Sequence, residues 1–114
     1  MLISSDKLAA FENAIYFPIL LTILERDRAS IERASFKFTS PYIKIIEQAI
    51  ERIQGDLKQN NIYFRQHKMK LNKLENDGTF TEYEFIYGGY NDTRRYMNFR
   101  LRNRTEELLE HYFK

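Results

Sequence analysis

The sequence predicts one domain of the α+β class over residues 1–114, mainly helical, in the order kinked N-terminal helix, long central helix, β-hairpin and C-terminal helix. Three observations predict it. Apolar residues recur in steps of four and three over residues 40–71, which is the helical spacing. Pro18 interrupts an earlier apolar segment of helical character. A turn sequence at residues 75–79 separates two short segments that suit paired strands.

The N-terminal helix is predicted to begin at Ser4 or Ser5, because either serine can cap the first free amides. Pro18 has no amide hydrogen to donate to the turn before it, so we expect a kink there or a boundary between two shorter helices. Residues 14–24 are almost wholly apolar, but this run is shorter than the roughly 20 residues that cross a bilayer. The first apolar stripe of the helix consists of Leu8, Phe11 and Ile15.

The central helix is predicted over residues 40–71, with Ser40 as N-cap and Pro41 as first helical residue. At about 1.5 Å per residue it would span roughly 46 Å, whereas a compact chain of this length is about 34 Å across. The helix must therefore break, protrude or lie against a second copy. We expect it to be continuous, because Gly55 weakens a helix without ending it. Its predicted self-association seam consists of Ile46, Ile50, Ile53, Leu57, Asn60, Phe64 and His67.

Asn60 and His67 are the polar residues of this seam. Polar seam residues often set the register or the oligomeric state of paired helices. The alternative is that this end of the helix is simply exposed. Phe36, Phe38 and Tyr42 lie around the connection between the two helices, where large rings are expected to pack the end of an antiparallel helix pair.

The hairpin is predicted to turn through a three-residue loop, residues 76–78, with Gly78 in the left-handed region. This register gives one apolar face and one matched charge pair, whereas a two-residue loop mismatches both faces. The long helix and the first strand then compete for residues 68–71, and residues 88–89, both glycine, end the hairpin with a flexible break. The expected pairs are Leu74 with Phe80, Leu71 with Tyr83, Met69 with Phe85 and Lys70 with Glu84.

The last helix is predicted to begin at Asn98, or at Asp92 at the earliest. Its first turns are basic and its later turns are acidic, which is the reverse of what the helix dipole favours. Helix stability therefore does not explain these arginines. The predicted apolar stripe of this helix consists of Leu101, Thr105, Leu108 and Tyr112.

The residue types that metal or nucleophile chemistry needs are sparse. The chain has no cysteine, and its two histidines, His67 and His111, lack the spacing of a metal motif. No glycine-rich phosphate loop or nucleophile motif is present, and the carboxylates are interpreted as solvated faces and ion pairs. We therefore expect a protein that is not an enzyme and holds no cofactor or metal. An enzyme or small-ligand carrier with a pocket under Pro18 is the third option.

The net charge is +2 at pH 7, so composition alone implies no polyanionic partner. Basic residues are nonetheless concentrated in residues 65–73 and 94–104, the latter interleaved with aromatic rings, a composition suited to phosphates and stacked bases. The alternative is that these arginines pair with glutamates or pack over tyrosines of the same chain. A nucleic-acid site would use Lys68, Lys70, Lys73, Arg94, Arg95, Arg100, Arg102 and Arg104.

Several short strings distinguish the chain: Glu25-Arg26-Asp27, Phe36-Lys37-Phe38 with Pro41-Tyr42, Asp77-Gly78-Thr79-Phe80-Thr81, Arg94-Arg95-Tyr96, and Arg102-Asn103 with Glu106-Glu107-Leu108-Leu109. Together they resemble the small YhjD-like proteins of Bacillus-type bacteria. The resemblance covers most of the chain and implies a bacterial, cytoplasmic setting. It supplies no catalytic or binding residue.

The function expected from the sequence is that of a small, cytoplasmic, non-enzymatic interaction or regulatory protein that self-associates through its central helix. Its expected partner is a second copy or another protein, with no membrane partner. The alternative class is a nucleic-acid-binding protein that uses residues 65–73 and 94–104. A single observation separates the two, namely whether these basic segments converge into one exposed patch.

Overall fold

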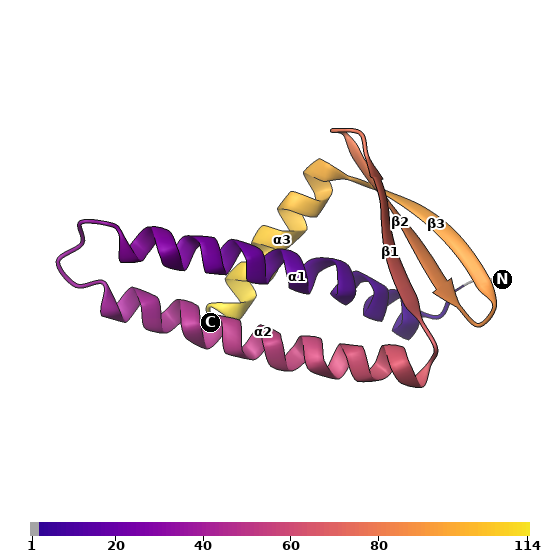
Figure 1. Cartoon of the computed structure of the whole chain (residues 1–114), viewed down its shortest axis with the longest axis horizontal. Coiled ribbons are helices and arrows are strands. Elements are labelled where there is room, and N and C mark those ends of the chain that lie inside the picture. The colour runs from indigo at the N-terminus through magenta and orange to yellow at the C-terminus, as the bar shows by residue number, and fades with distance from the viewer. Residues whose placement is uncertain (1–2) are drawn as a thin grey trace.

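The computed structural model describes residues 3–114 as three helices and one antiparallel sheet (Figure 1). The elements follow the order α1 (Ser5–Glu32), α2 (Ser40–Gln66), β1 (Lys70–Asn76), β2 (Phe80–Tyr87), β3 (Tyr90–Met97) and α3 (Asn98–Tyr112). The helices α1 and α2 form a long antiparallel hairpin, the sheet covers the N-terminal half of α1, and α3 crosses back over the middle of the hairpin. The predicted mainly helical α+β class is confirmed.

The molecule is elongated because the helical hairpin extends beyond the sheet and α3 (Figure 1). Its principal extents are 56 × 32 × 18 Å and its radius of gyration is 16.2 Å, against about 13 Å for a compact chain of this length. The long helix therefore protrudes, which is one of the three outcomes that its length allowed. Its partner along most of this length is α1 of the same chain.

The first helix begins as predicted and continues through its proline. The Ser4 hydroxyl oxygen accepts a hydrogen bond from the Lys7 amide at 3.2 Å, which is an N-cap. Pro18 lies inside α1 and does not divide it, so of the two predicted alternatives, a kink or a boundary between two helices, the boundary is wrong. The Thr22 hydroxyl donates to the Pro18 carbonyl oxygen at 3.0 Å, one turn further on.

The same helix is long and apolar enough, by length and composition alone, to cross a membrane, and no other helix within residues 3–114 passes that test. The prediction counted only the continuous apolar run, residues 14–24, and so underestimated it. In the fold α1 supplies residues to both hydrophobic clusters, as the core helix of a folded domain does.

The second helix is continuous through Gly55 but ends at Gln66, five residues before the predicted end. Lys68 adopts a left-handed conformation with φ 51°, the Met69 amide donates to the Phe64 carbonyl at 2.9 Å, and the Lys68 amide donates to the Arg65 carbonyl at 3.3 Å. These two bonds are a Schellman motif, which ends a helix by satisfying its last carbonyls. The strand therefore takes residues 70–71 of the contested stretch, and residues 68–69 lie in the turn between α2 and β1. At the other end Thr39, not Ser40, is the N-cap.

The first two strands pair in a register that the sequence did not predict. Leu71 lies opposite Phe85, and Lys70 lies opposite Ile86 instead of Glu84. The predicted faces are kept, because the register is displaced by two residues, and an irregularity between Lys73 and Asn76 adjusts it near the turn. The carboxylate of Asp77 fixes the turn by accepting hydrogen bonds from the Thr79 and Phe80 amides at 2.9 and 2.8 Å, and Gly78 has the predicted positive φ.

The third strand was not predicted. Gly88 and Gly89 have φ values of 53° and 81°, and they form a tight turn that places Tyr87 opposite Tyr90. The sheet order is therefore β1-β2-β3, with β2 in the centre. The residues between the glycines and Asn98 form β3, and α3 begins at Asn98.

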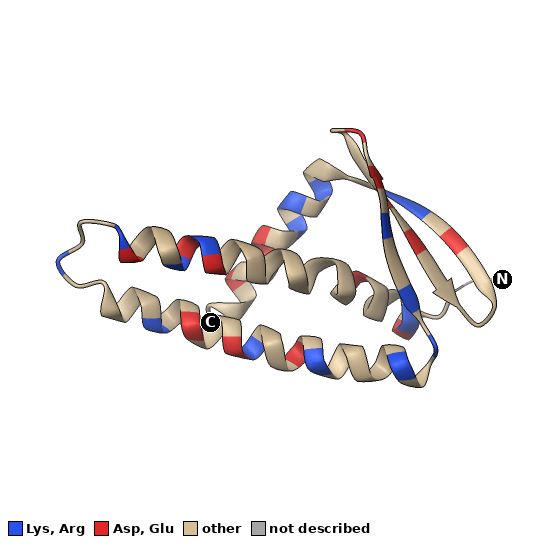
Figure 2. Cartoon of the chain, in the orientation of Figure 1, with Lys and Arg blue, Asp and Glu red and all other residues tan. Residues whose placement is uncertain are grey.

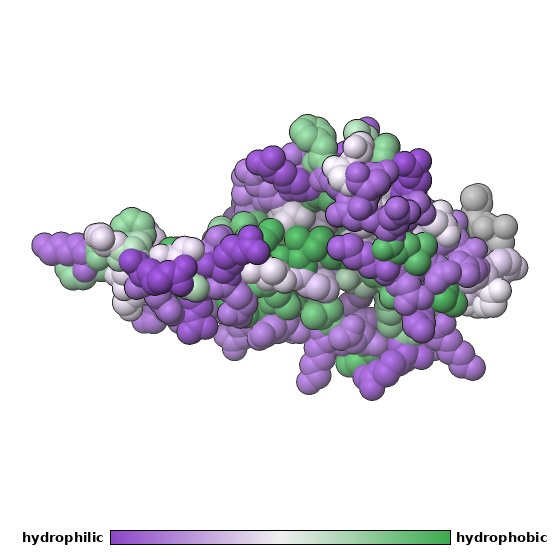
Figure 3. All heavy atoms as spheres, turned by 45° about the horizontal axis from the view of Figure 1, so that its top comes forward, coloured by the Kyte–Doolittle hydropathy of each residue, from purple (hydrophilic) through white to green (hydrophobic). Residues whose placement is uncertain are grey.

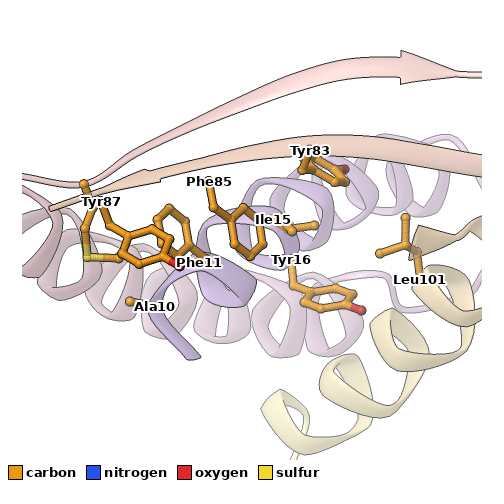
Figure 4. Close-up of a cluster of buried hydrophobic side chains, with 9 residues drawn as sticks. Ala10, Phe11, Ile15, Tyr16, Tyr83, Phe85, Tyr87 and Leu101 are labelled. Atoms are coloured by element: carbon orange, nitrogen blue, oxygen red, sulfur yellow. The ribbon is translucent and has the colours of Figure 1, made fainter. Parts of the chain in front are cut away.

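Two hydrophobic clusters lie on either side of the point where α3 crosses the hairpin. In the first, Phe11 of α1 stacks on Phe85 of β2 with ring centroids 4.2 Å apart, and Tyr83 and Tyr87 lie beside it (Figure 4). The second joins α1 and α2, with residues of α3 against it, and its buried members are Phe17, Leu20, Leu24, Ile46, Ala49, Ile50, Ile53 and Tyr112. Burial of these side chains is the main source of stability.

Candidate interaction groove

The predicted self-association seam lies inside the chain. Ile46, Ile50 and Ile53 are buried against α1, and Asn60 is 7 % exposed. Leu57 and Phe64 are partly buried against the same two clusters, and only His67 at the end of the seam is exposed. The apolar edge of α2 is therefore already covered by its own chain. It is not the free surface on which the predicted pairing of two copies depended.

The two arginines of β3 point to opposite faces of the sheet, as neighbouring residues of a strand do. The Arg94 guanidinium lies 5.4 Å from the ring centre of Phe85 and forms an ion pair with Asp92 at 3.0 Å. The Arg95 guanidinium lies 4.1 Å from the ring centre of Phe80 and 3.9 Å from the carboxylate of Asp77. Both therefore have partners within the chain, the alternative that the sequence left open.

The other predicted nucleic-acid residues are spread over separate elements. Lys68 lies in the turn before the sheet, Lys70 and Lys73 lie on β1, and β2 separates them from the arginines of β3. Figure 2 shows acidic residues next to the basic residues of β1, β3 and α3. In α3, Arg104 forms an ion pair with Glu107 at 2.9 Å, and Arg100 and Arg102 lie on the same helix. The predicted nucleic-acid residues are therefore divided among the turn before the sheet, the two outer strands and α3.

A different surface is open. Residues 14–26 of α1 face α2 on one side, while their other side borders a hollow of about 450 Å³ between α1 and the sheet. Leu71 and Lys73 of β1 and Tyr83 of β2 form its far wall. Its helical wall consists of Ala14, Ile15, Pro18, Ile19, Thr22, Ile23 and Arg26.

A second hollow, of about 350 Å³, lies between the same helix and α3. Ile19 and Ile23 line both hollows, so the two hollows adjoin at these isoleucines, which we call the floor of one groove. Hydrophobic side chains are exposed in the middle of this face (Figure 3). We call this surface the α1 groove. Its wall on the side of α3 consists of Leu101, Arg102, Thr105, Glu106 and Leu109.

The charged residues of the α1 groove are mostly basic. Arg26 and Lys73 line the first hollow, and Arg102 lines the second together with Glu106, the one acidic residue of the two linings. None of the ion pairs found within residues 3–114 involves these three basic residues. The groove is thus an apolar floor with cations along its sides that have no carboxylate partner in the described chain.

Three tyrosines near the groove have raised pKa values, and burial and a neighbouring carboxylate account for them. Burial raises the pKa of the Tyr83 phenol, and burial together with Glu12 raises the pKa of Tyr16. Burial and the Glu12 carboxylate, which accepts a hydrogen bond from the Tyr96 hydroxyl at 3.3 Å, raise the pKa of Tyr96. These phenols stay protonated at neutral pH and act as hydrogen-bond donors or core residues. Within residues 3–114 no group of three or more metal-ligating side chains exists.

The sequence contained a signal for this groove. Residues 14–24 are apolar nearly all round, and a helix of that kind has more apolar surface than one neighbouring helix can cover. A pocket under Pro18 was the third option that the sequence left open, and Pro18 does line the first hollow. The contribution of α3 was not foreseen, because the position of its axis relative to α1 depends on the unpredicted strand β3.

The fold and its groove define a class of protein: a small, mainly helical α+β protein in which a helical hairpin supports a three-stranded sheet and a returning helix. Residues 2–114 match the family described as YhjD protein. The chain is also 36 % identical over 101 residues to a protein of Bacillus subtilis (strain 168) described as "Uncharacterized protein YhjD", a match that covers 89 % of this chain and 84 % of that protein. The chain therefore belongs to the YhjD family. No solved structure matched it.

Proposed function

We propose that this protein is a non-enzymatic binding protein that holds an acidic, amphipathic helix of another protein in its α1 groove. The observation that carries the proposal is the shared floor of the two hollows, Ile19 and Ile23, which joins them into one open apolar surface. An amphipathic helix binds such a surface by placing side chains three and four residues apart into successive hollows.

The charges of the groove favour an acidic binding partner. Arg26, Lys73 and Arg102 form no ion pair with a carboxylate among residues 3–114, and the acidic face of a bound helix would supply such carboxylates. A second copy placed about a twofold axis would bring like charges together, which is unfavourable. A small molecule would gain little enclosure, since the groove is open along one side. The nucleic-acid alternative has weaker support because its basic residues are divided between separate elements.

The test uses two synthetic helical peptides with the same apolar face, one with glutamates and one with lysines on the polar face. Fluorescence anisotropy is measured with the full chain at rising salt. We expect the acidic peptide to bind and to weaken as salt rises, because exposed charges are screened. No binding of either peptide, or equal binding of both, would contradict the proposal.

Three variants give the test its specificity. Ile23→Asp places a charge on the groove floor, and we expect it to weaken binding at least about tenfold. Ile45→Asp is the matched control, since Ile45 is 48 % exposed and lies on α2 outside the groove. The double variant Arg26→Glu with Lys73→Glu is expected to transfer preference from the acidic to the basic peptide. Light scattering on each variant distinguishes a second copy as occupant, which would appear as a dimer that Ile23→Asp dissociates.

A further inference from the structure

The far end of the helical hairpin carries exposed aromatic rings that the fold does not use. Phe38 is 67 % exposed, and Phe36 and Tyr42 are each 53 % exposed. They were expected to pack the end of the hairpin, but Phe36 contacts Tyr42, with ring centroids 5.4 Å apart, and neither joins a buried cluster. We call residues 33–45 the hairpin tip. The expectation of a packed end is wrong, and folding does not explain these rings.

The apolar surface continues from the rings onto both helices that meet there. Ile45 of α2 is 48 % exposed and Phe113, just after α3, is 44 % exposed. They line a hollow of about 330 Å³ together with Tyr42, Ile31 and Asp27, the one acidic residue of this lining. The tip lies at the end of the molecule that is away from the sheet, on the left in Figures 1 and 3.

The charge of the tip has one sign. Residues 33–45 include three basic residues, Arg33, Lys37 and Lys44, and no acidic residue. The nearest carboxylates on either side, Glu32 and Glu47, both form ion pairs with Arg28, at 3.3 and 3.4 Å. The Lys37 ammonium lies 5.6 Å from the ring centre of Phe38. Aromatic rings and cations therefore occupy the same protruding loop.

We propose that the hairpin tip binds the surface of an anionic phospholipid bilayer. Phe36 and Phe38 would enter the headgroup region, where aromatic rings are favoured, while Arg33, Lys37 and Lys44 attract the lipid phosphates. A loop with two or three exposed rings is too small for a stable protein interface, which needs roughly 800 Å² from each partner. A deformable lipid surface accepts such a tip without a matching cavity. Peripheral contact of this kind needs no bilayer-length apolar run, so it departs from the sequence-based expectation of no membrane partner.

The experiment is co-sedimentation of the full chain with vesicles at low salt. One set contains phosphatidylglycerol and phosphatidylethanolamine, and the other contains phosphatidylcholine alone. We expect the protein to bind the anionic vesicles, to bind them less as salt rises, and not to bind the neutral ones. Failure to bind anionic vesicles, or equal binding to both sets, would overturn the proposal.

The variants distinguish vesicle binding by the tip from nonspecific binding by other exposed apolar residues. Phe36→Ser with Phe38→Ser is expected to reduce anionic-vesicle binding at least about tenfold, as is the charge variant Lys37→Glu with Lys44→Glu. Phe99→Ser is the control, because Phe99 is 66 % exposed on α3 and outside the tip; it should bind like the unchanged protein. Circular dichroism verifies folding. Equal binding by the tip double variant overturns the proposal, as does an equal loss with Phe99→Ser. The Ile23→Asp variant should bind vesicles normally, so this result is independent of the groove.

Discussion

Asn60 of α2 donates a hydrogen bond from its Nδ2 to the main-chain carbonyl oxygen of Ala10 on α1, across 2.9 Å. Its Oδ1 accepts a hydrogen bond from Asn13 Nδ2 at 3.4 Å. The side chain is nearly buried, and both bonds join the two helices of the hairpin. The sequence indicated that Asn60 could set either register or oligomeric state. The bonds lie within one chain, so they fix the register of α1 against α2.

Replacing this residue tests that role. Asn60→Ala should lower the free energy of unfolding by about 1–2 kcal/mol, because it removes hydrogen bonds in a buried position. Urea denaturation measures the change. Asn61→Ala is the matched control, since Asn61 is exposed on the same turn and should change stability by less than about 0.5 kcal/mol. An equal effect of the two variants would mean that the bonds to α1 contribute nothing.

The helices were predictable because each repeats its apolar residues at helical spacing. Periodicity, however, predicts that a helix face is buried and does not identify the segment that buries it. The seam of α2 was therefore assigned to a second copy, whereas α1 of the same chain buries it. Strand β3 was missed for a related reason. Asp92 and Arg94 are charged yet lie on the face of Phe85, and Arg94 packs over that ring. A strand whose inward residues are charged gives no alternating pattern.

The register of the first hairpin was unpredictable for a different reason. The expected ion pair of Lys70 with Glu84 favoured a register that is wrong. In the structure the Glu84 carboxylate instead accepts hydrogen bonds from Asn72 and Asn91, each at 2.8 Å. Neutral amides on both neighbouring strands thus replaced the expected ion pair. These bonds also lower the pKa of Glu84. Side-chain bonds that bridge three strands depend on β3, and β3 was not foreseen.

The end of α2 offers a stabilising substitution. Lys68 has φ 51°, a conformation that costs a residue with a Cβ about 1 kcal/mol and costs glycine little. Lys68→Gly should therefore raise the free energy of unfolding by about 0.5–1 kcal/mol. Lys58→Gly, at an exposed position inside the same helix, should lower it by about 1 kcal/mol. Thermal denaturation of both variants measures the contrast, and a loss of stability with Lys68→Gly would contradict it.

The turn at Asp77 makes stability depend on pH. Hydrogen bonds from the Phe80 and Thr79 amides, with a smaller contribution from Arg95, hold the pKa of this carboxyl below its ordinary value of 3.8. A group whose pKa is lowered on folding stabilises the protein above the unfolded value and loses that effect as pH falls through the folded value. Acidification below pH 3.8 should therefore weaken the hairpin.

Asp77→Asn tests this dependence, because it removes the charge and keeps an acceptor oxygen. Its free energy of unfolding should fall less steeply than that of the unchanged protein as the pH is lowered. Glu75→Gln is the control, because the side chain of Glu75 forms no hydrogen bond or ion pair among residues 3–114 that the substitution could remove. The free energy of unfolding of this variant should fall with pH as steeply as that of the unchanged protein. Parallel profiles for Asp77→Asn and the unchanged protein would remove Asp77 as the cause.

Pro18 is retained inside α1 at a cost to the helix. A proline in a helix interior has no amide hydrogen for the carbonyl of Ala14, and the penalty relative to alanine is about 3 kcal/mol. Pro18 is exposed and lines the α1 groove, so its replacement removes no buried contact. Pro18→Ala should therefore raise the free energy of unfolding by about 1–3 kcal/mol in urea denaturation. Pro41→Ala is the matched control, because Pro41 lies in the first turn of α2, where amides need no helical partner. An equal gain from both variants would mean that the missing hydrogen bond at Pro18 does not set the effect, since the loss of proline stiffness in the unfolded chain acts in the opposite direction.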